Sequence, residues 1–296
     1  TGTVGDTTVN SGGIVAPGNS IGTINVAGDI SFAGGSFLDV EVDHEGNSDL
    51  THATGTATIT GGTVRLMAED TGDTYIALNT PYTILTGDTA VAGTFDAVTT
   101  TSLFVTPSLS YDANNVYVTA ARNGTSFRTV AATYNQHQVA AALDALPTTS
   151  TAVAAAATQT SAAGAQAFFD AVDGSLHANI KGSLSSGDRA FVEFFEDYTQ
   201  DQSYFATYYG NWTERQHFSG NNQGFMFGRT KHISPIETLS FAGAFERSTY
   251  DDLGAPSGQS NHYRAAAAYG RDLGNGFSLK TQALYSYHTI ETDRYI

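Results

Sequence analysis

The sequence predicts a mainly β protein in which a short helical stretch separates two β regions of different kinds. Long runs near the C-terminus alternate apolar and polar residues with a period of two, which is typical of strands with two different surroundings. Short β runs near the N-terminus are separated by glycine-rich turns, and the 296 residues contain 31 glycines but only 6 prolines. A chain of this length is expected to contain two or three structural units.

The C-terminal part, residues 203–296, is predicted to form about five long antiparallel strands. Their expected ranges are 203–213, 223–231, 237–250, 261–273 and 277–295. In the third run, Phe241 and Phe245 fall on one face, and Ser240 and Glu246 fall on the other. Strands of about 10 residues or more, with aromatic residues near their ends, are longer than the five or six residues usual in soluble sheets. The pattern favours the wall of a transmembrane β-barrel, and a soluble antiparallel sandwich is the alternative.

The N-terminal part, up to about Ala121, consists of short β runs and turns. Runs such as 21–26, 37–42 and 56–60, repeated roughly every 10–20 residues, suggest the coils of a β-solenoid. Because an open sheet edge at the end of such a stack promotes aggregation, we expect a capping β unit from 82–85, 93–98 and 116–119. The predicted core of this cap consists of Tyr82, Ile84, Leu85, Phe95, Leu109 and Tyr111.

Three helices are expected between the β regions. Val139, Leu143 and Leu146 keep helical spacing up to Pro147, where the first helix should stop. One face of the second helix is predicted to carry Phe169, Val172, Leu176 and Ile180. The third helix is predicted to present Phe191, Phe194 and Phe195, with Asp188 as its N-cap residue.

Composition excludes several classes of function. Asp and Glu (29) outnumber Lys and Arg (13), and the formal net charge of −16 argues against a nucleic-acid partner, which requires a basic surface. The absence of cysteine excludes disulfides and cysteine metal sites. No run of about 20 apolar residues predicts a transmembrane helix. We expect no cofactor.

Two short motifs resemble chemical sites but are predicted to be structural. Residues 18–22 match the G-x-S-x-G nucleophile elbow, yet Pro17 precedes them and a strand pattern follows, whereas the elbow needs a helix there. The cluster of Asp43, His44, Glu45, Asp49 and His52 matches no standard metal-ligand spacing and is interpreted as an acidic turn. We therefore predict that this chain is not an enzyme.

Several motifs carry a family resemblance in the order in which they occur. They are residues 16–23, 54–64, 82–86, 93–96 and 109–112, then Asn135-Gln136 with 139–146, then 174–178 and finally 285–294. The first five resemble the passenger end of type Va autotransporters of Gram-negative bacteria, and the last resembles a strand of their translocator. The similarity extends over nearly the whole chain.

The resemblance implies a right-handed parallel β-helix end with an autochaperone-like cap (1–121), a helical linker and lumenal helix (122–202), and the first part of an outer-membrane barrel (203–296). Family barrels usually have twelve strands, whereas this sequence supplies about five. An open half-barrel would leave unsatisfied backbone groups in lipid. Since the sequence also lacks a starting Met and a signal peptide, we expect the natural chain to extend beyond both ends.

The resemblance also implies that the third helix enters the barrel lumen. There Glu193, Glu196 and Asp197 are expected to face Arg264 and Lys280. His262 and His288 are expected to share the polar face of neighbouring strands.

The implied function is type V secretion: the barrel inserts in the cell outer membrane, and an N-terminal passenger is exported and displayed at the cell surface. The implied partners are outer-membrane lipid, the barrel-assembly machinery, periplasmic chaperones and a ligand on a host or neighbouring cell. One alternative is a structural β-solenoid adhesin or stalk, which binding by the intact passenger would reveal. Another is the C-terminal part of a secreted enzyme, which a catalytic motif upstream would reveal.

Overall fold

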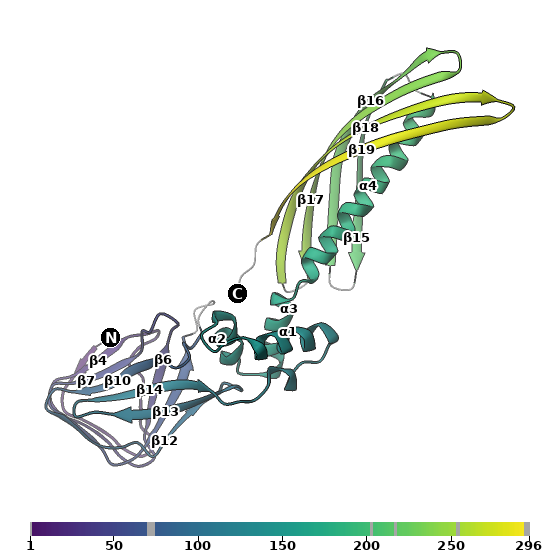
Figure 1. The fold of residues 1–296 in the computed structure, drawn as a ribbon. Helices are drawn as coiled ribbons and strands as arrows, with labels where there is room; N and C mark the ends of the chain where they lie inside the picture. The colour runs from purple at the N-terminus through teal and green to yellow at the C-terminus, as the bar shows by residue number, and fades with distance from the viewer. Residues whose placement is uncertain (1, 70–74, 202–203, 216–217, 253–254, 293–296) are drawn as a thin grey trace. The chain divides into compact units, whose positions relative to one another are not determined.

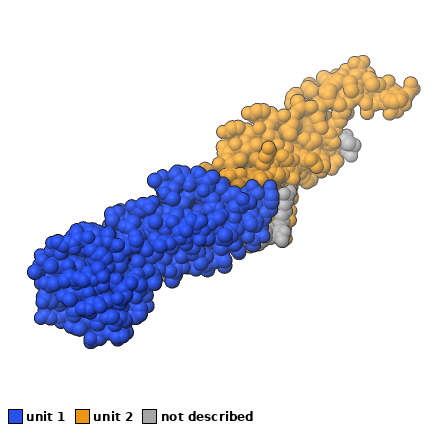
Figure 2. Space-filling model, turned by 60° about the horizontal axis from the view of Figure 1, so that its bottom comes forward, with its two compact units in different colours: residues 1–172, 296 blue, residues 173–295 orange. Residues whose placement is uncertain are grey.

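The computed structural model describes residues 2–69, 75–201, 204–215, 218–252 and 255–292. Ser203 and residues 293–295, which the expected first and last C-terminal strands include, lie outside the described residues. The chain divides after Val172 into two compact units, which Figure 2 shows in separate colours. Each unit is described by itself.

The first unit begins with a parallel β-helix (Figure 1). Its strands are β1 (Gly2–Val4), β2 (Thr7–Val9), β3 (Ile14–Val15), β4 (Thr23–Val26), β5 (Ile30–Phe32), β6 (Phe37–Val42), β7 (Leu50–Ala53), β8 (Thr56–Ile59), β9 (Thr63–Ala68), β10 (Pro81–Gly87), β11 (Ala90–Gly93) and β12 (Ala97–Thr100). Each strand pairs in parallel with the strand three positions earlier in the chain. The resulting orders are β1-β4-β7-β10, β2-β5-β8-β11 and β3-β6-β9-β12. The predicted solenoid is confirmed.

The short strands stack because each coil points alternate side chains into a shared core. Phe32, Leu38, Val40 and Leu66 are fully buried in it. The turns between the strands need glycine where coils approach closely: Gly93 has φ +89°, and a Cβ there would lie 1.9 Å from the carbonyl oxygen of a residue in β8. The glycine-rich segments between the predicted strands therefore form turns in the structure.

The stack ends where parallel pairing changes to antiparallel pairing. Strand β10 pairs in parallel with β7 on one side and antiparallel with β14 (Asn115–Arg122) on the other, and β14 pairs antiparallel with β13 (Val105–Tyr111). Strand β13 forms the edge of this sheet, and its Pro107 has no N–H to offer a further strand.

Helices follow the β-helix in the first unit. They are η1 (Phe127–Thr129), α1 (Tyr134–Ala145), α2 (Thr151–Thr158) and α3 (Ala162–Val172). Thr133 and Gln136 form a capping box at the start of α1, which ends before Pro147 as predicted. The Phe127 ring packs edge-on against Phe104 and Phe169, with ring centroids 4.9 and 6.4 Å apart.

The predicted second helix is wrong in one respect. Phe169 and Val172 end α3, whereas Leu176 and Ile180 belong to a separate helix, α4 (Ser175–Asp201). Asp173 and Gly174 break the chain between them, and the Asp173 carboxylate accepts a hydrogen bond from the Ser175 N–H at 2.8 Å, as an N-terminal cap does.

The second unit is a five-stranded antiparallel sheet with α4 along one face (Figure 1). Its strands, paired in chain order, are β15 (Tyr204–Arg215), β16 (Phe218–Ser234), β17 (Glu237–Asp252), β18 (Ala255–Gly274) and β19 (Phe277–Thr292). The β18–β19 hairpin turns through Asn275 and Gly276 at φ +55° and +81°, which is the Asn-Gly pattern of a type I′ turn. Within the described residues, no helix is both long and apolar enough to cross a membrane.

Candidate functional site

The face of the sheet away from α4 is apolar and exposed. One cross-strand row carries Tyr208, Phe225, Phe245, Tyr263 and Tyr287, each register-paired with the next. These five side chains are 42–62% exposed. A continuous aromatic row across all five strands is the pattern of the girdle that a membrane barrel presents at the lipid interface.

The opposite face lies beneath α4 and combines small residues with buried polar groups. Phe191 and Phe195 of the helix are buried against it. The small residues that leave room for these rings are Ala242, Ala244, Ala266 and Ala268. Gly187 also lets the helix approach the sheet, since a Cβ there would lie 2.7 Å from a guanidinium nitrogen of Arg264.

Arg264 is the centre of the buried polar network. Its Nε donates to Asp188 Oδ1 of α4 at 2.7 Å, and its Nη1 lies 3.1 Å from Glu246 Oε2 of β17. Asp188 Oδ1 also accepts a hydrogen bond from the Ser286 hydroxyl at 2.9 Å. The Arg264 side chain is fully buried and that of Glu246 is 3% exposed, so the ions compensate each other without water.

Two histidines extend this network along the covered face. The Nδ1 atoms of His262 and His288 are 2.7 Å apart, so the N–H of one ring donates a hydrogen bond to the other ring. His262 Nε2 lies 2.8 Å from the hydroxyls of Ser248 and Ser260. His288 Nε2 lies 3.8 Å from Asp188 Oδ2. The network thus joins α4 to β17, β18 and β19.

Ser248, His262 and Glu246 form no catalytic triad. A triad places the hydroxyl and the carboxylate on opposite ring nitrogens of the histidine. Here Glu246 Oε1 lies 3.7 Å from Nε2, the same nitrogen that meets Ser248, while Nδ1 meets His288. The arrangement holds a helix against a sheet and does not activate a nucleophile.

The structure places the predicted lumenal residues unevenly. Arg264, His262, His288 and Lys280 share the sheet face on which α4 lies, but the Lys280 side chain is exposed, as are those of Glu193 and Asp197. Glu196 Oε1 accepts a hydrogen bond from the side chain of Gln282 at 2.9 Å. Among the described residues, the ionic partners of Arg264 are Asp188 and Glu246, which the sequence analysis did not pair with it.

The assignment of Asp188 as a helix cap is wrong, because α4 runs without interruption from Ser175 to Asp201. A sequence signal for its true position existed. Asp188 precedes Phe191 by three residues and Phe195 by seven, so all three lie on one helix face.

The predicted cap residues gather in the first unit. Tyr82, Ile84, Leu85 and Phe95 are buried, and Leu109 and Tyr111 pack against the same core.

Two tyrosine hydroxyls in this cluster are hydrogen-bonded. The Tyr82 hydroxyl donates to the Asp43 carbonyl at 2.7 Å and accepts from the Ala77 N–H at 2.8 Å, and burial raises the pKa of Tyr82 to about 12. The Tyr111 hydroxyl accepts from the Phe95 N–H at 3.1 Å, and burial raises the pKa of Tyr111.

The motifs interpreted as structural have structural partners. The Ser20 hydroxyl donates to the Glu69 carboxylate, and strand β4 follows where a nucleophile elbow needs a helix. Asp49 accepts hydrogen bonds from two backbone N–H groups, and His52 lies 3.0 Å from Asp88. In the part of the chain that the structure describes, no three His, Asp or Glu residues are grouped to hold a metal ion.

Comparison with known proteins identifies the C-terminal sheet. The family described as "Autotransporter beta-domain" matches residues 204–296. Two proteins of Serratia marcescens, both named "Extracellular serine protease", are 36% identical over 154 residues and 31% identical over 140 residues, which are 50% and 45% of this chain. The matches cover only 15% and 13% of those relatives. The C-terminal strands, residues 204–296, therefore belong to the autotransporter β-domain family.

Proposed function

We propose that this chain exports and displays an N-terminal passenger, with β15–β19 in the barrel wall, α4 in the lumen, and the first unit at the cell surface. The observation that carries this proposal is the inversion of the sheet: the aromatic row is exposed, whereas Arg264, Glu246 and His262 are buried. A soluble sandwich would bury the aromatic rings and expose the ions. Lipid on one side and a helix-filled lumen on the other account for both faces.

The dimensions of α4 fit this role. Its 27 residues span about 40 Å at about 1.5 Å per residue, which exceeds the roughly 30 Å hydrocarbon core of a bilayer. Its polar groups meet Arg264, Ser286 and Gln282 of the sheet instead of lipid. The helix can therefore remain in the lumen as the last segment of the exported chain.

The first unit is proposed to direct folding of the passenger after export. The antiparallel strands β13 and β14 close the β-helix at its C-terminal end, which leaves the lumen first in a hairpin model of export. Each coil that stacks on this formed end buries apolar surface, which disfavours movement back into the periplasm without ATP. A chain without cysteine also contains no disulfide-closed loop to obstruct a narrow lumen.

The proposed partners follow from the proposed export of the passenger across the outer membrane. Insertion of an antiparallel barrel in the outer membrane requires lipid and, by family resemblance, the barrel-assembly machinery with periplasmic chaperones. A ligand on a host or neighbouring cell would bind the passenger.

We propose that this chain itself performs no catalytic step. The translocator domain of autotransporters is not catalytic. The two similar Serratia marcescens proteins are named serine proteases, which favours a second candidate for the whole protein: a passenger with a serine protease domain upstream. Inhibition of secreted proteolysis by a serine-directed reagent would support that candidate, and a passenger without such activity would count against it.

The export proposal is tested on the full-length protein in purified outer membranes. An unheated sample should migrate faster on a gel than a boiled one, as a folded barrel does, and protease added to intact cells should remove the passenger alone. A soluble protein without a heat-dependent shift would mean that the strands form a sandwich, and the proposal would fall.

A further inference from the structure

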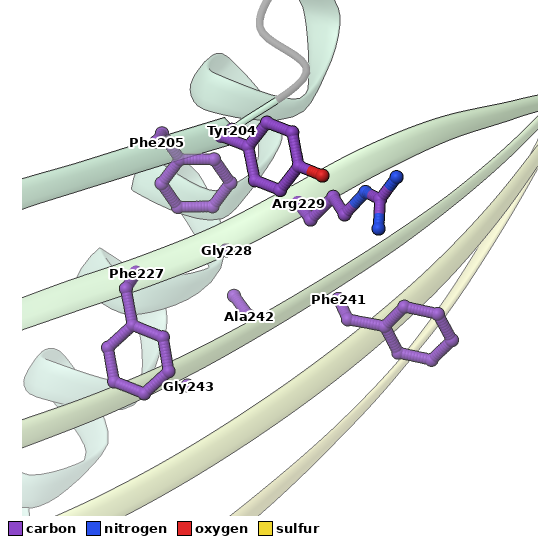
Figure 3. Close-up of a pocket in the computed structure, with 8 residues that line it drawn as sticks. All are labelled: Tyr204, Phe205, Phe227, Gly228, Arg229, Phe241, Ala242 and Gly243. Atoms are coloured by element: carbon purple, nitrogen blue, oxygen red, sulfur yellow. The ribbon is translucent and has the colours of Figure 1, made fainter.

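The exposed face of the sheet contains a shallow apolar depression near the start of β15. Its volume is about 570 Å³, within the size range of small-molecule sites. The residues that shape it are Tyr204, Phe227, Gly228, Arg229, Phe241 and Gly243 (Figure 3).

Strand register explains the hollow. Tyr204, Arg229 and Phe241 form one cross-strand row, and Phe227 and Gly243 belong to the next row on the same face. The row between them points its side chains to the opposite face, toward α4. Gly243 has no side chain, and the Phe227 ring lies over it: a Cβ at residue 243 would stand 3.1 Å from a carbon of that ring. The Phe227 ring therefore lies low against the sheet and forms one side of the depression.

Arg229 is the unusual residue in this wall. Its guanidinium carbon lies 4.7 Å from the ring centroid of Tyr204. Among the described residues no carboxylate pairs with it, whereas Arg271 on the same face pairs with Glu237 at 3.8 Å and the buried Arg264 has two carboxylate partners. Lys231, on the same face of β16, adds a second positive charge.

The position of this charge requires a partner of opposite sign. Arg229 lies between Phe227 along its strand and Phe241 on the next strand, so it interrupts the apolar surface of the sheet. A charge on the lipid-facing side of a barrel is unfavourable to an extent that rises with depth, and long basic side chains extend toward the headgroups. Stacking on Tyr204 uses the face of the guanidinium and leaves its in-plane N–H groups free to bind a phosphate at two oxygens.

We propose that Arg229 binds the phosphate of an anionic phospholipid, and that an acyl chain of the same lipid fills the depression between Phe227 and Phe241. This inference rests on the proposed function, which places this face of the sheet in lipid. Charge complementarity supports the choice of occupant: Arg229 lines the apolar hollow, and Lys231 follows it two residues later on the same face, in a chain of net charge −16. Tyr204 is 66% exposed beside them and suits the interface between headgroups and acyl chains.

Native mass spectrometry of the full-length protein in detergent tests the site, with phosphatidylglycerol and a diacylglycerol of the same acyl chains as probes. Wild-type protein should retain phosphatidylglycerol about tenfold more tightly than diacylglycerol, because only the former carries the phosphate. Arg229→Gln should remove that preference. Gly243→Leu, whose side chain would displace the Phe227 ring into the depression, should weaken retention of both lipids.

Arg247→Gln is the matched control. Arg247 is also exposed on the outer face of β17, but it donates to the Gln259 side chain at 2.8 Å and lies on the other side of the aromatic row. Its replacement should leave phosphatidylglycerol retention unchanged. Equal retention by the Arg229→Gln and Arg247→Gln variants, or no preference of wild-type protein for phosphatidylglycerol over diacylglycerol, would overturn the inference. Inorganic phosphate should not displace the lipid, and displacement would indicate a simple anion site instead.

Heat-dependent gel mobility of the same samples separates this inference from the proposed function. A wild-type barrel without selective lipid retention refutes the lipid site alone, and a wild-type protein without a mobility shift refutes the export proposal. If Arg229→Gln prevents barrel formation, Arg229→Lys replaces it. That variant keeps the charge but not the two-oxygen geometry, and it should show a smaller preference for phosphatidylglycerol than wild type. A preference equal to that of wild type would count against the site.

Discussion

Reversing the charge of Arg264 should destabilise the second unit strongly. In Arg264→Glu a third carboxylate would replace the guanidinium that now meets Asp188 at 2.7 Å and Glu246 at 3.1 Å. The three acids would meet between α4 and the sheet, and no Arg or Lys among the described residues would remain to pair with Glu246. The helix should lose its main polar attachment to the sheet.

The size of this effect follows from burial. Removing one partner of a buried ion pair costs about 3–5 kcal/mol, because the remaining charge stays desolvated. The Arg264 and Glu246 side chains are 0% and 3% exposed and take the full penalty, whereas Asp188 is 31% exposed and part of its charge is screened by water. We therefore expect a loss of about 3–5 kcal/mol in the free energy of unfolding.

Urea unfolding of the full-length protein in detergent, followed by heat-dependent gel mobility, measures this loss. Arg271→Gln is the control, because its guanidinium is 49% exposed, pairs with Glu237 at 3.8 Å and should contribute only about 0–1 kcal/mol. The double variant Arg264→Glu/Glu246→Arg should recover part of the stability. A midpoint for Arg264→Glu equal to that of Arg271→Gln would refute the reasoning.

Three predictions concern the first unit. Phe95→Ala should cost about 3–5 kcal/mol, because the ring is 7% exposed; it should slow appearance of protease-accessible passenger in a pulse–chase experiment, and an unchanged rate would contradict the proposed cap. Tyr82→Phe should cost about 1–3 kcal/mol through its lost hydroxyl bonds; faster limited proteolysis of the displayed passenger would reveal it, and wild-type resistance would argue against it. The N–H of Asn114, with further donors, lowers the pKa of Asp112 to about 2 from 3.8. This carboxylate therefore stabilises the fold above pH 3.8, and its contribution disappears as the pH falls through about 2. An Asp112→Asn variant should be less protease-resistant than wild type at neutral pH and equal to it below pH 2, and a difference that persists in acid would contradict this linkage.

Much of the fold could be predicted because it follows from local periodicity. Alternation at Phe241, Phe245 and Tyr263 correctly identified the exposed face of the sheet, since a strand necessarily sends successive side chains to opposite sides. The glycine-rich turns between short β runs identified the coils of the β-helix. The strand bounds were less accurate: the expected 223–231 run is part of the longer β16 (Phe218–Ser234), because pairing with both neighbours extends regular structure through Gly220 and Asn221.

The start of helix α4 and the contacts of Asp188 could not be predicted from local signals. Gly187 and Asp188 suggest the start of a helix, since glycine weakens a helix interior and aspartate favours a cap. Tertiary contacts reverse both preferences here: the Arg264 guanidinium occupies the space where a side chain at residue 187 would stand, and it binds the Asp188 carboxylate. The partner lies 76 residues away in sequence. Helical spacing of Asp188, Phe191 and Phe195 was the only local sign of this face.

The strands of both units alternate apolar and polar residues, but the two units bury opposite faces of their strands. The burial of the ion pairs distinguishes the two arrangements. In the β-helix the apolar side chains point inward, and the Arg65–Asp39 pair lies on the outer surface with side chains 38% and 20% exposed. A pair of this kind contributes about 0–1 kcal/mol and tolerates water. In the second unit the apolar rings point outward, and Arg264 and Glu246 are buried. Periodicity alone does not distinguish these arrangements, because both alternate with a period of two. The covered ion pair does, since a buried charge persists only where fixed partners replace water, and α4 supplies one of those partners through Asp188.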